Sequence, residues 1–169
     1  MPGTKRDLTM ADVRSVMLLA AERPERETYK RIEALAKETC GWRLLTMLKY
    51  VEADAVVERV SSSDEKAYPL GGRKPLDKIT ASHGVTGVGD IFLAATKEDV
   101  RKAFFDHELI FSLGITAIMN VPIRHAGRRL GTINFCGEEG MYGAREKEIG
   151  RVLAGLLVPA LLMATAKAG

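Results

Sequence analysis

The clearest alternation of hydrophobic and polar residues lies between positions 113 and 135 of the sequence. Two runs rich in β-forming residues, Ile115–Ile123 and Leu130–Phe135, flank a short polar connection that contains Gly127, a pattern typical of a β-hairpin. Side chains alternate between the two faces of a strand, so the odd-numbered positions form an apolar face and the even-numbered positions a mixed one. We expect the apolar face to join the main core and the mixed face to form the wall of a pocket.

Whether the even-numbered residues of both strands share one face depends on the length of the hairpin loop. With a three-residue loop over 125–127 and its glycine in the left-handed conformation, Arg124 pairs with Arg128 and all even-numbered positions share one face. A two-residue loop would break this parity. If the parity holds, Asn120 and Asn134 share the pocket wall, where each amide needs a hydrogen-bond partner: a ligand, a buried water or the other amide.

Periodicity and capping signals predict the remaining elements of the chain. Helical spacing predicts helices over 10–21, 25–39, 97–105, 106–113 and 144–166, with Thr9 and Thr96 as N-caps and a kink at Pro159. Strands are predicted over 43–50 and 55–61, as an antiparallel pair, and over 90–96, in the centre of the sheet. The stretch 61–89, rich in Gly, Pro and Ser, is expected to be irregular, with a short helix over 77–82.

The order of these elements predicts the fold class. Mostly antiparallel strands, with helices grouped at the two ends of the chain, favour an α+β domain. We expect the terminal helices on one face of the sheet, and the irregular segment and the two short helices on the other face as a lid. Residues 1–24 are expected to form an N-terminal helical extension, and residues 25–169 a single domain.

Composition and charge exclude several classes of protein. With 46% hydrophobic and 28% charged residues in 169 positions, the chain is similar to soluble globular proteins rather than to disordered ones. The net charge is only +3 and the basic residues are scattered, which argues against a nucleic-acid partner. Charges near the start of the chain and Pro159 in the longest apolar run argue against a signal peptide and a membrane span. Two distant cysteines, Cys40 and Cys136, fit the reducing cytoplasm.

Metal and acid–base chemistry find little support in the sequence. His83, His107 and His125 have no metal-ligand spacing and no nearby cysteine, so neither a metal nor a cofactor is expected. Asp106, His107 and Glu108 could act in acid–base chemistry. Adjacent helical residues point in different directions, however, and a solvated charged turn is the favoured interpretation. His125 is expected at the surface.

Two further segments suggest phosphate or anion binding. The glycine-rich stretch 84–89 is similar to a phosphate loop but lacks the Gly-Lys-Ser/Thr ending, so a flexible connection is favoured. Arg73 and Lys74, beside Gly71 and Gly72, could bind an anion at the mouth of the pocket, although ordinary surface charge is the simpler explanation.

Aromatic residues could stack on a planar ligand in the pocket. Tyr68 and the phenylalanines near the lid are the candidates, although packing of the lid would also bury Phe104 or Phe105. With the two amides and the threonine at position 96, they complete the predicted ligand-binding set: Asn120, Asn134, Tyr68, Phe92, Thr96, Phe105 and Phe111.

Several short stretches resemble the landmarks of one family. They are Thr-Cys-Gly-Trp-Arg-Leu-Leu-Thr at 39–46, Tyr-Pro-Leu-Gly-Gly at 68–72, Phe-Ser-Leu-Gly at 111–114, Asn-Val-Pro-Ile at 120–123 and Leu-Gly-Thr-Ile-Asn at 130–134. Over about Glu25 to Ala166 the chain is similar to GAF domains. The resemblance implies a five- or six-stranded antiparallel sheet, a small-molecule pocket on the face away from the terminal helices, and frequent dimerisation through those helices.

Departures from the signatures of individual GAF subfamilies narrow the implied function. The Asn-Lys-Phe-Asp/Glu signature of cyclic-nucleotide-binding members is absent, and neither cysteine has the adjacent histidine that bilin attachment requires. The related free methionine-R-sulfoxide reductases use several cysteines near the pocket. Here Cys40 precedes the first strand and only Cys136 lies at a strand end.

The leading hypothesis is a stand-alone, non-catalytic sensory module in the cytoplasm that binds a small polar molecule. Because no output domain is fused, the signal is expected to leave by homodimer or partner association. The helices over 10–21, 25–39 and 144–166 are the expected dimer surface, since their apolar faces look too wide for one sheet to cover. The alternatives are a thiol-dependent reductase that uses Cys136 and a structural interaction module with a collapsed pocket.

Overall fold

The computed structural model describes residues 4–76 and 91–167 of the chain. Its strands are β1 (Leu44–Val51), β2 (Val56–Ser62), β3 (Arg73–Pro75), β4 (Phe92–Ala94), β5 (Ala117–His125) and β6 (Arg128–Gly137). Its helices are α1 (Met10–Glu22), α2 (Glu25–Thr39), α3 (Lys97–Ala103), α4 (His107–Ser112), α5 (Ala144–Leu156) and α6 (Val158–Ala166), with a 3₁₀ turn, η1, at Glu52–Asp54.

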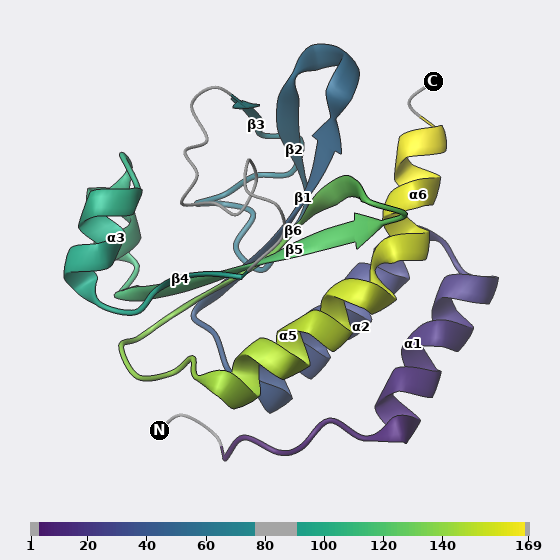
Figure 1. The fold of residues 1–169 in the computed structure, drawn as a ribbon, viewed down its shortest axis with the longest axis horizontal. Helices are drawn as coiled ribbons and strands as arrows, with labels where there is room; N and C mark the ends of the chain where they lie inside the picture. Colours follow the sequence, from purple (N-terminus) through teal and green to yellow (C-terminus); the bar gives the residue numbers. More distant parts are fainter. Residues whose placement is uncertain (1–3, 77–90, 168–169) are drawn as a thin grey trace.

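The described strands form one antiparallel six-stranded sheet in the order β3-β2-β1-β6-β5-β4. Helices α1, α2, α5 and α6 gather on one side of this sheet, while α3 lies apart from them beside β4 (Figure 1). The α+β class and the antiparallel sheet are therefore confirmed, with six strands. The predicted placement of the terminal helices and of the lid helices on opposite faces is confirmed as well.

The two edges of the sheet differ from the sequence-based expectation. The sequence does not predict β3, because Pro75 and the glycine pair before the strand are turn residues. β4 is expected in the centre of the sheet but lies at its edge, where it pairs with β5. The strand is apolar for another reason: Leu93 packs against the core on the helix side, and Ala94 belongs to a smaller core on the opposite face. The helix expected over 77–82 lies outside the described residues.

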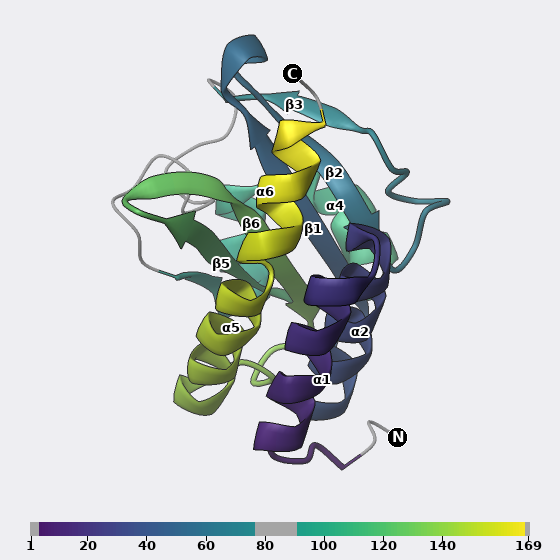
Figure 2. The same cartoon turned by 90° about the vertical axis from the view of Figure 1, so that its right-hand side faces the viewer.

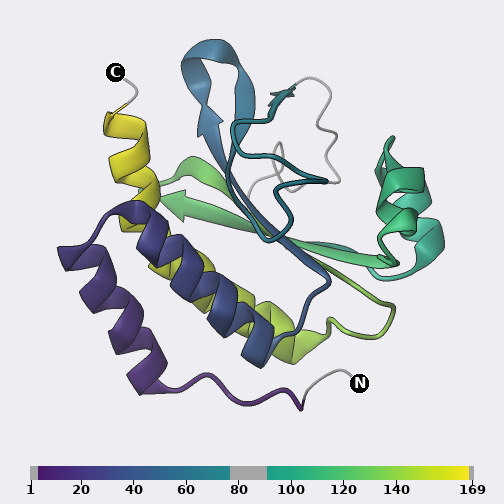
Figure 3. The same ribbon diagram turned by 180° about the vertical axis from the view of Figure 1, so that it is seen from behind.

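The main core contains side chains of both the sheet and the terminal helices, which lie along one face of the sheet in Figures 2 and 3. Leu35 of α2 and Leu153 of α5 are fully buried there, against Met119 and Phe135 of the sheet. α1 lies on the outside of α2, and its Val16 completes the cluster. The terminal helices thus cover one face of the sheet and leave the other face to α3, α4 and the segment between β2 and β3.

The sequence predicts a single C-terminal helix over 144–166 with a kink at Pro159, whereas the structure divides this stretch into two helices. Leu157 separates α5 from α6, and Pro159 occupies the first turn of α6, where its missing N–H is not needed. By length and composition alone the stretch Ala144–Ala166 could cross a membrane. In this fold Leu157 and Leu161 of the stretch are fully buried in the main core.

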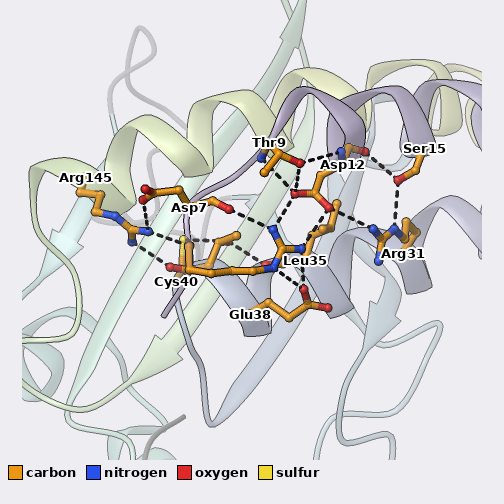
Figure 4. Close-up of polar contacts among 11 residues, drawn as sticks. Asp7, Thr9, Asp12, Ser15, Arg31, Leu35, Glu38, Cys40 and Arg145 are labelled. Carbon is orange, nitrogen blue, oxygen red and sulfur yellow. Dashed lines mark hydrogen bonds and ion pairs between the residues drawn. The ribbon is translucent and has the colours of Figure 1, made fainter. Parts of the chain in front are cut away.

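A polar network ties the residues before α1 to the helical layer (Figure 4). Thr9 caps α1 in a reciprocal capping box with Asp12, and Arg6 donates to both Asp12 carboxylate oxygens at 2.7 and 3.0 Å. Arg31 of α2 reaches the same carboxylate at 3.2 Å. The bonds from Arg6, with those from Thr9, hold the pKa of Asp12 well below its ordinary value despite burial. Arg145 of α5 donates to the Arg6 carbonyl oxygen at 2.7 Å.

The β5–β6 hairpin has a two-residue loop, so the predicted three-residue loop is wrong. Ala126 and Gly127 form the turn with φ values of 48° and 75°, and His125 pairs with Arg128. Two successive residues with positive φ match the right-handed twist of the flanking strands, which explains why the shorter loop is adopted.

A β-bulge in β6 restores the parity that the shorter loop would otherwise have broken. Ile123 pairs with Gly131, so Leu130 is the extra residue, and it joins the main core. Asn120 therefore lies directly opposite Asn134. The even-numbered residues next to this pair, such as Ile118 and Thr132, share the cavity face, as the sequence predicts, although the bulge rather than the loop is the cause. Leu130 is the exception to the predicted even-numbered face, because the bulge turns its side chain into the main core.

Candidate ligand-binding site

Alternation along the hairpin sends neighbouring side chains to different surroundings. Met119 and Ile133 face the terminal helices in the main core. Ile118 and Cys136 face the opposite way and join the smaller core around α3 and α4. A cavity lies on this second face, between the sheet and α4.

The cavity is small and partly enclosed. The volume of the cavity is about 70 Å³, which is room for about two or three water molecules at roughly 30 Å³ each. Strands β2, β1, β6 and β5 form its floor, and the segment 68–74 and residues around α4 form its walls. The lining residues are Leu44, Thr46, Leu48, Val57, Arg59, Tyr68, Gly72, Lys74, Phe104, Asp106, Ile110, Ile115, Ile118, Asn120, Thr132, Asn134 and Cys136.

One row of the sheet makes the floor of the cavity polar. Thr46, Asn134 and Asn120 are register neighbours on β1, β6 and β5, and Asn134 Nδ2 donates to Thr46 Oγ1 at 3.1 Å. Asn120 is only 2% exposed, and its Oδ1 atom is buried with no hydrogen-bond partner in the described part of the chain. Because an unsatisfied buried acceptor costs about 1–3 kcal/mol, a donor from a ligand or a water is expected at this atom.

Charged residues gather on the β2–β3 side of the cavity. Arg59 of β2 is only 8% exposed. Its Nη1 donates a hydrogen bond to the Pro69 carbonyl oxygen at 3.0 Å. Its Nε is buried and has no hydrogen-bond partner among residues 4–76 and 91–167. Lys74 Nζ lies 3.7 Å from Asp106 Oδ2, and the Tyr68 hydroxyl donates to the same oxygen at 3.5 Å. The other carboxylate oxygen, Asp106 Oδ1, is buried and likewise lacks a partner within the described ranges.

Burial changes the ionisation of two of these residues. It lowers the pKa of Arg59, although a guanidinium remains charged at neutral pH. It raises the pKa of Tyr68, and the nearby Asp106 carboxylate adds to the rise, so the phenol stays neutral. The cluster therefore combines two cations with one carboxylate and presents an excess of positive charge to the cavity.

The two thiols lie on opposite sides of the sheet. Cys136 lines the cavity, but burial raises the pKa of its thiol to about 12. Cys40 lies in the main core, and burial raises its pKa to about 11. Both thiols are therefore protonated and weakly nucleophilic at neutral pH. Across residues 4–76 and 91–167, no group of three or more His, Cys, Asp or Glu side chains is placed to hold a metal ion.

Three of the seven predicted ligand-binding residues, Asn120, Asn134 and Tyr68, line the cavity. The two amides come from the even-numbered face of the hairpin, and Tyr68 comes from the turn between β2 and β3. Their contact with a ligand stays a prediction.

The other four predicted residues lie outside the cavity lining. Phe92 and Phe111 pack at the edge of the smaller core. Thr96 caps α3 in a capping box with Asp99, and Phe105 is 77% exposed. The sequence pattern places an aromatic residue near the lid correctly but does not tell which aromatic side chain turns inward, because the lid helices are short and irregular.

Most of the charged end of the cavity is missed by sequence reasoning. Arg59 is not singled out, because a charged residue on a strand is usually solvated. Lys74 lines the cavity, as the anion-binding alternative requires, whereas Arg73 pairs with Glu58 near the surface. The prediction of a solvated turn over 106–108 is wrong for Asp106. This residue directly precedes α4, and its side chain lines the cavity. The stretch 84–89 and the histidine at position 83 lie outside the described residues.

Comparisons with known sequences identify no relative. No protein-family model matches the chain, and no similar curated protein was found.

Solved structures with the same fold are numerous. The GAF domain of a phosphoenolpyruvate-protein phosphotransferase from Coxiella burnetii aligns over 94% of this chain and 95% of that one, with a TM-score of 0.74 and 14% identity. Free methionine-R-sulfoxide reductase from Neisseria meningitidis, solved with its substrate, aligns over 100% of both chains, with a TM-score of 0.67 and 14% identity. A phycoerythrobilin-bound GAF domain from a cyanobacterial phytochrome covers 94% of this chain and 98% of its own, with a TM-score of 0.67 and 14% identity. The chain therefore has the fold of the GAF domains, as the landmarks in its sequence predict.

Proposed function

We propose that this protein is a cytoplasmic, non-catalytic sensory module that binds a small polar molecule in the cavity between the sheet and α4. The observation that carries the proposal is a set of buried polar atoms without partners in the described chain: Asn120 Oδ1, Asp106 Oδ1 and Arg59 Nε. Most buried polar groups in proteins are hydrogen-bonded, and three unsatisfied atoms around one cavity favour a ligand that completes them.

The cavity is not filled by the aromatic side chains that would close it. A structural module with a collapsed pocket requires phenylalanines beneath the lid. Phe104 reaches the cavity wall, but Phe105 is exposed and Phe111 lies outside the lining. The open volume that remains supports a binding function over a purely structural one.

Close packing of α5 on the sheet offers a route from the cavity to the terminal helices. Gly150 of α5 lies so near β5 that an added Cβ would be 3.0 Å from Val121 Cγ2. Val121 is one residue after Asn120, on the opposite face of the same strand. A ligand that shifts β5 would therefore move α5 as well, since packed interiors transmit displacement.

The outer faces of the terminal helices support a homodimer as the form that passes on the signal. Met17 and Leu18 of α1 and Met163 of α6 are exposed. An apolar groove between α1 and the α5–α6 junction is lined by residues that include Met17, Leu156 and Pro159. Exposed apolar surface of this kind is typical of an interface, and association of two copies or of a partner protein would cover it.

Thermal-shift screening tests the proposed function directly. Nucleotides, amino acids and aromatic acids are screened against the parent protein, and hits are repeated with Asn120→Ala and Asn134→Ala. We expect both variants to lose the stabilisation, while Ser112→Ala, an exposed control on α4, keeps it. Hits that stabilise both asparagine variants as well as the parent would show that the amide wall is not the binding site.

Thiol-dependent reduction of free methionine-R-sulfoxide is the second candidate function. Cys136 lines the cavity, and a reductase of this type has the same fold along its whole length. The high pKa of Cys136 and the position of Cys40 across the sheet disfavour it. A reductase assay with methionine sulfoxide decides between the two, and unchanged activity in Cys136→Ser would remove this thiol from the mechanism.

A further inference from the structure

The charges that line the cavity do not balance. Three of its described lining residues are charged: Arg59, Lys74 and Asp106. Lys74 and Asp106 lie within ion-pair distance, at 3.7 Å, and so offset each other. Arg59 is left as the excess cation, because no carboxylate of the described chain lies within ion-pair distance of it.

The backbone around Arg59 is shaped to hold its guanidinium. Arg59 N–H donates to the Gly72 carbonyl oxygen and Gly71 N–H donates to the Arg59 carbonyl oxygen, both at 2.9 Å. A Cβ at position 72 would lie 2.6 Å from Arg59 Nη1, so glycine is what leaves room for the side chain. The Tyr68 ring lies beside the guanidinium, with its centroid 5.1 Å from Cζ. The Tyr-Pro-Leu-Gly-Gly stretch is therefore a cradle for this arginine.

A buried arginine with an unpartnered N–H lowers the stability of the folded protein unless an anion binds it. Arg59 is more than nine-tenths buried, lines the cavity and has an unpartnered Nε. A buried charge without a counter-charge destabilises a fold, whereas a guanidinium and a carboxylate form a short, two-pronged hydrogen-bonded pair.

We propose that Arg59 is the anion-binding residue of the cavity, and that the ligand is a small monocarboxylate that also carries a hydroxyl or amino group. The carboxylate meets Arg59, and the hydroxyl or amino group donates to Asn120 Oδ1, the unpartnered acceptor on the floor. This assignment rests on the proposed binding function and specifies its ligand class.

Size and charge favour a carboxylate over a phosphate ester. The lining has one positive charge in excess, whereas a phosphate monoester carries about −1.5 to −2 at neutral pH. The cavity volume of about 70 Å³ also favours a small ligand over a bulky one.

Matched pairs of ligands test the assignment. Calorimetric titrations compare glycolate, L-lactate, L-serine and L-alanine with glycolamide, lactamide, serinamide and alaninamide, which keep the shape but lose the negative charge. L-Phosphoserine serves as the phosphate arm. We expect binding from at least one carboxylate, and weaker or no binding from its amide and from L-phosphoserine.

Variants assign the effect to Arg59. Arg59→Gln is expected to weaken carboxylate binding by about 10- to 100-fold, the loss of a charge-assisted bond. Gly72→Ala keeps the arginine but displaces its guanidinium, so it is expected to weaken binding even if Arg59→Gln folds poorly. Arg73→Gln removes a neighbouring positive charge outside the cavity lining and is the matched control, expected to bind as the parent does.

Each other outcome overturns the assignment in a distinguishable way. If amides bind the parent as tightly as carboxylates and Asn120→Ala abolishes that binding, the cavity is a binding site but Arg59 is not its anion-binding residue. Full binding by Arg59→Gln leads to the same conclusion. Tighter binding of L-phosphoserine than of L-serine would instead contradict the monocarboxylate as the ligand class, because a guanidinium also binds phosphate. Absence of binding by every probe at millimolar concentration contradicts both the assignment and the proposed function.

Discussion

Buried charge in this molecule is of two kinds. Asp12 is buried within a network in which Arg6, Arg31 and the capping residue Thr9 donate to its carboxylate. Arg59 is buried to a similar degree but keeps a free donor beside a cavity. The first arrangement stabilises the fold, and the second is the one that we propose binds an anion.

Replacement of Asp12 tests the structural network. Asp12→Asn is expected to lower the free energy of unfolding at pH 7 by about 2 kcal/mol, because Arg6 and Arg31 lose their charged acceptor. The measurement is urea-induced unfolding. Asp7→Asn, at an exposed carboxylate that pairs with Arg145, is the control and should change stability little.

The same residue predicts a pH dependence of stability. Since the folded protein holds the pKa of Asp12 below its ordinary value, its contribution is present above about pH 4 and is lost as the pH falls further. Stability of the parent should therefore fall more steeply between about pH 4 and pH 2 than that of Asp12→Asn. Parallel pH profiles of the two proteins would contradict this account.

Single residues of the site were predictable to different degrees. Asn120 and Asn134 follow from alternation, because an amide on a half-apolar strand stands out from its neighbours. The role of Arg59 could not be predicted from alternation. Glu58 beside it is also charged, and the alternation along β2 does not tell which of the two side chains turns inward. The burial of Asp106 depends on how α4 docks, a tertiary feature that its local sequence does not encode.

At the scale of elements, the β5–β6 hairpin and its neighbour β1 determine the geometry of the cavity. The bulge at Leu130 puts Asn120 opposite Asn134, and Thr46 of β1 completes the row. Close approach of β1 and β6 is possible because Gly131 has no side chain there.

Substitution of Gly131 tests this close approach. A Cβ at this position would lie 1.9 Å from the Leu48 carbonyl oxygen, so Gly131→Ala is expected to destabilise the protein by about 3 kcal/mol. Thermal unfolding measures the effect. Gly155→Ala, in α5 with nothing within 4 Å, is the control and should instead stabilise the protein by roughly 0.5–1 kcal/mol. A parent-like melting temperature for Gly131→Ala would show that the two strands can separate at little cost.

The capping box of α3 gives a second prediction at this scale. Thr96→Ala should lower stability by about 1 kcal/mol, because the hydroxyl accepts from the Asp99 N–H at the helix start. Chemical unfolding and carboxylate titration are measured on the same variant. Unchanged affinity is expected, since Thr96 lies outside the cavity lining, and a loss of affinity would restore it as a ligand contact.

Helices whose ends carry clear capping residues or a proline were predicted well, whereas the hairpin loop and the order of the strands were not. The helices over 10–21 and 25–39 were predicted to within a residue, because Thr9, Asp12 and the break near Pro24 mark their ends. The loop length of the hairpin was wrong because the bulge at Leu130 leaves no local signature. The order of strands in the sheet depends on long-range pairing, so the edge position of β4 was not readable from its apolar composition.

At the scale of the whole molecule, the two faces of the sheet have different surroundings. One face packs on the terminal helices, and the other carries the cavity and its charged end. In the proposed function, a change on the cavity face would reach the helices through the strands of the sheet, and the exposed apolar groove beside α1 would be the surface for association.

Oligomeric state tests the proposed exit of the signal. Light scattering at tens of micromolar is expected to give twice the monomer mass, because exposed apolar side chains on the terminal helices would be covered in a dimer. Met17→Glu, in the groove, should shift the protein toward monomer, while Phe105→Glu, exposed on the opposite side near α4, should not. A monomeric parent protein would contradict the dimer proposal. Association with a partner protein would then be the remaining way to cover the groove.

The most direct test of the central claim is a nuclear magnetic resonance titration of the labelled protein with the hydroxy- and amino-carboxylates. The account predicts that the side-chain amide signals of Asn120 and Asn134 and the backbone signals of Arg59 shift in a saturable manner. The shifts at Val16 and Leu35 in the helical layer, which lie across the sheet from the cavity, should be smaller than those at the cavity residues. Saturable shifts confined to the terminal helices, with the two asparagine amides unmoved, would contradict it.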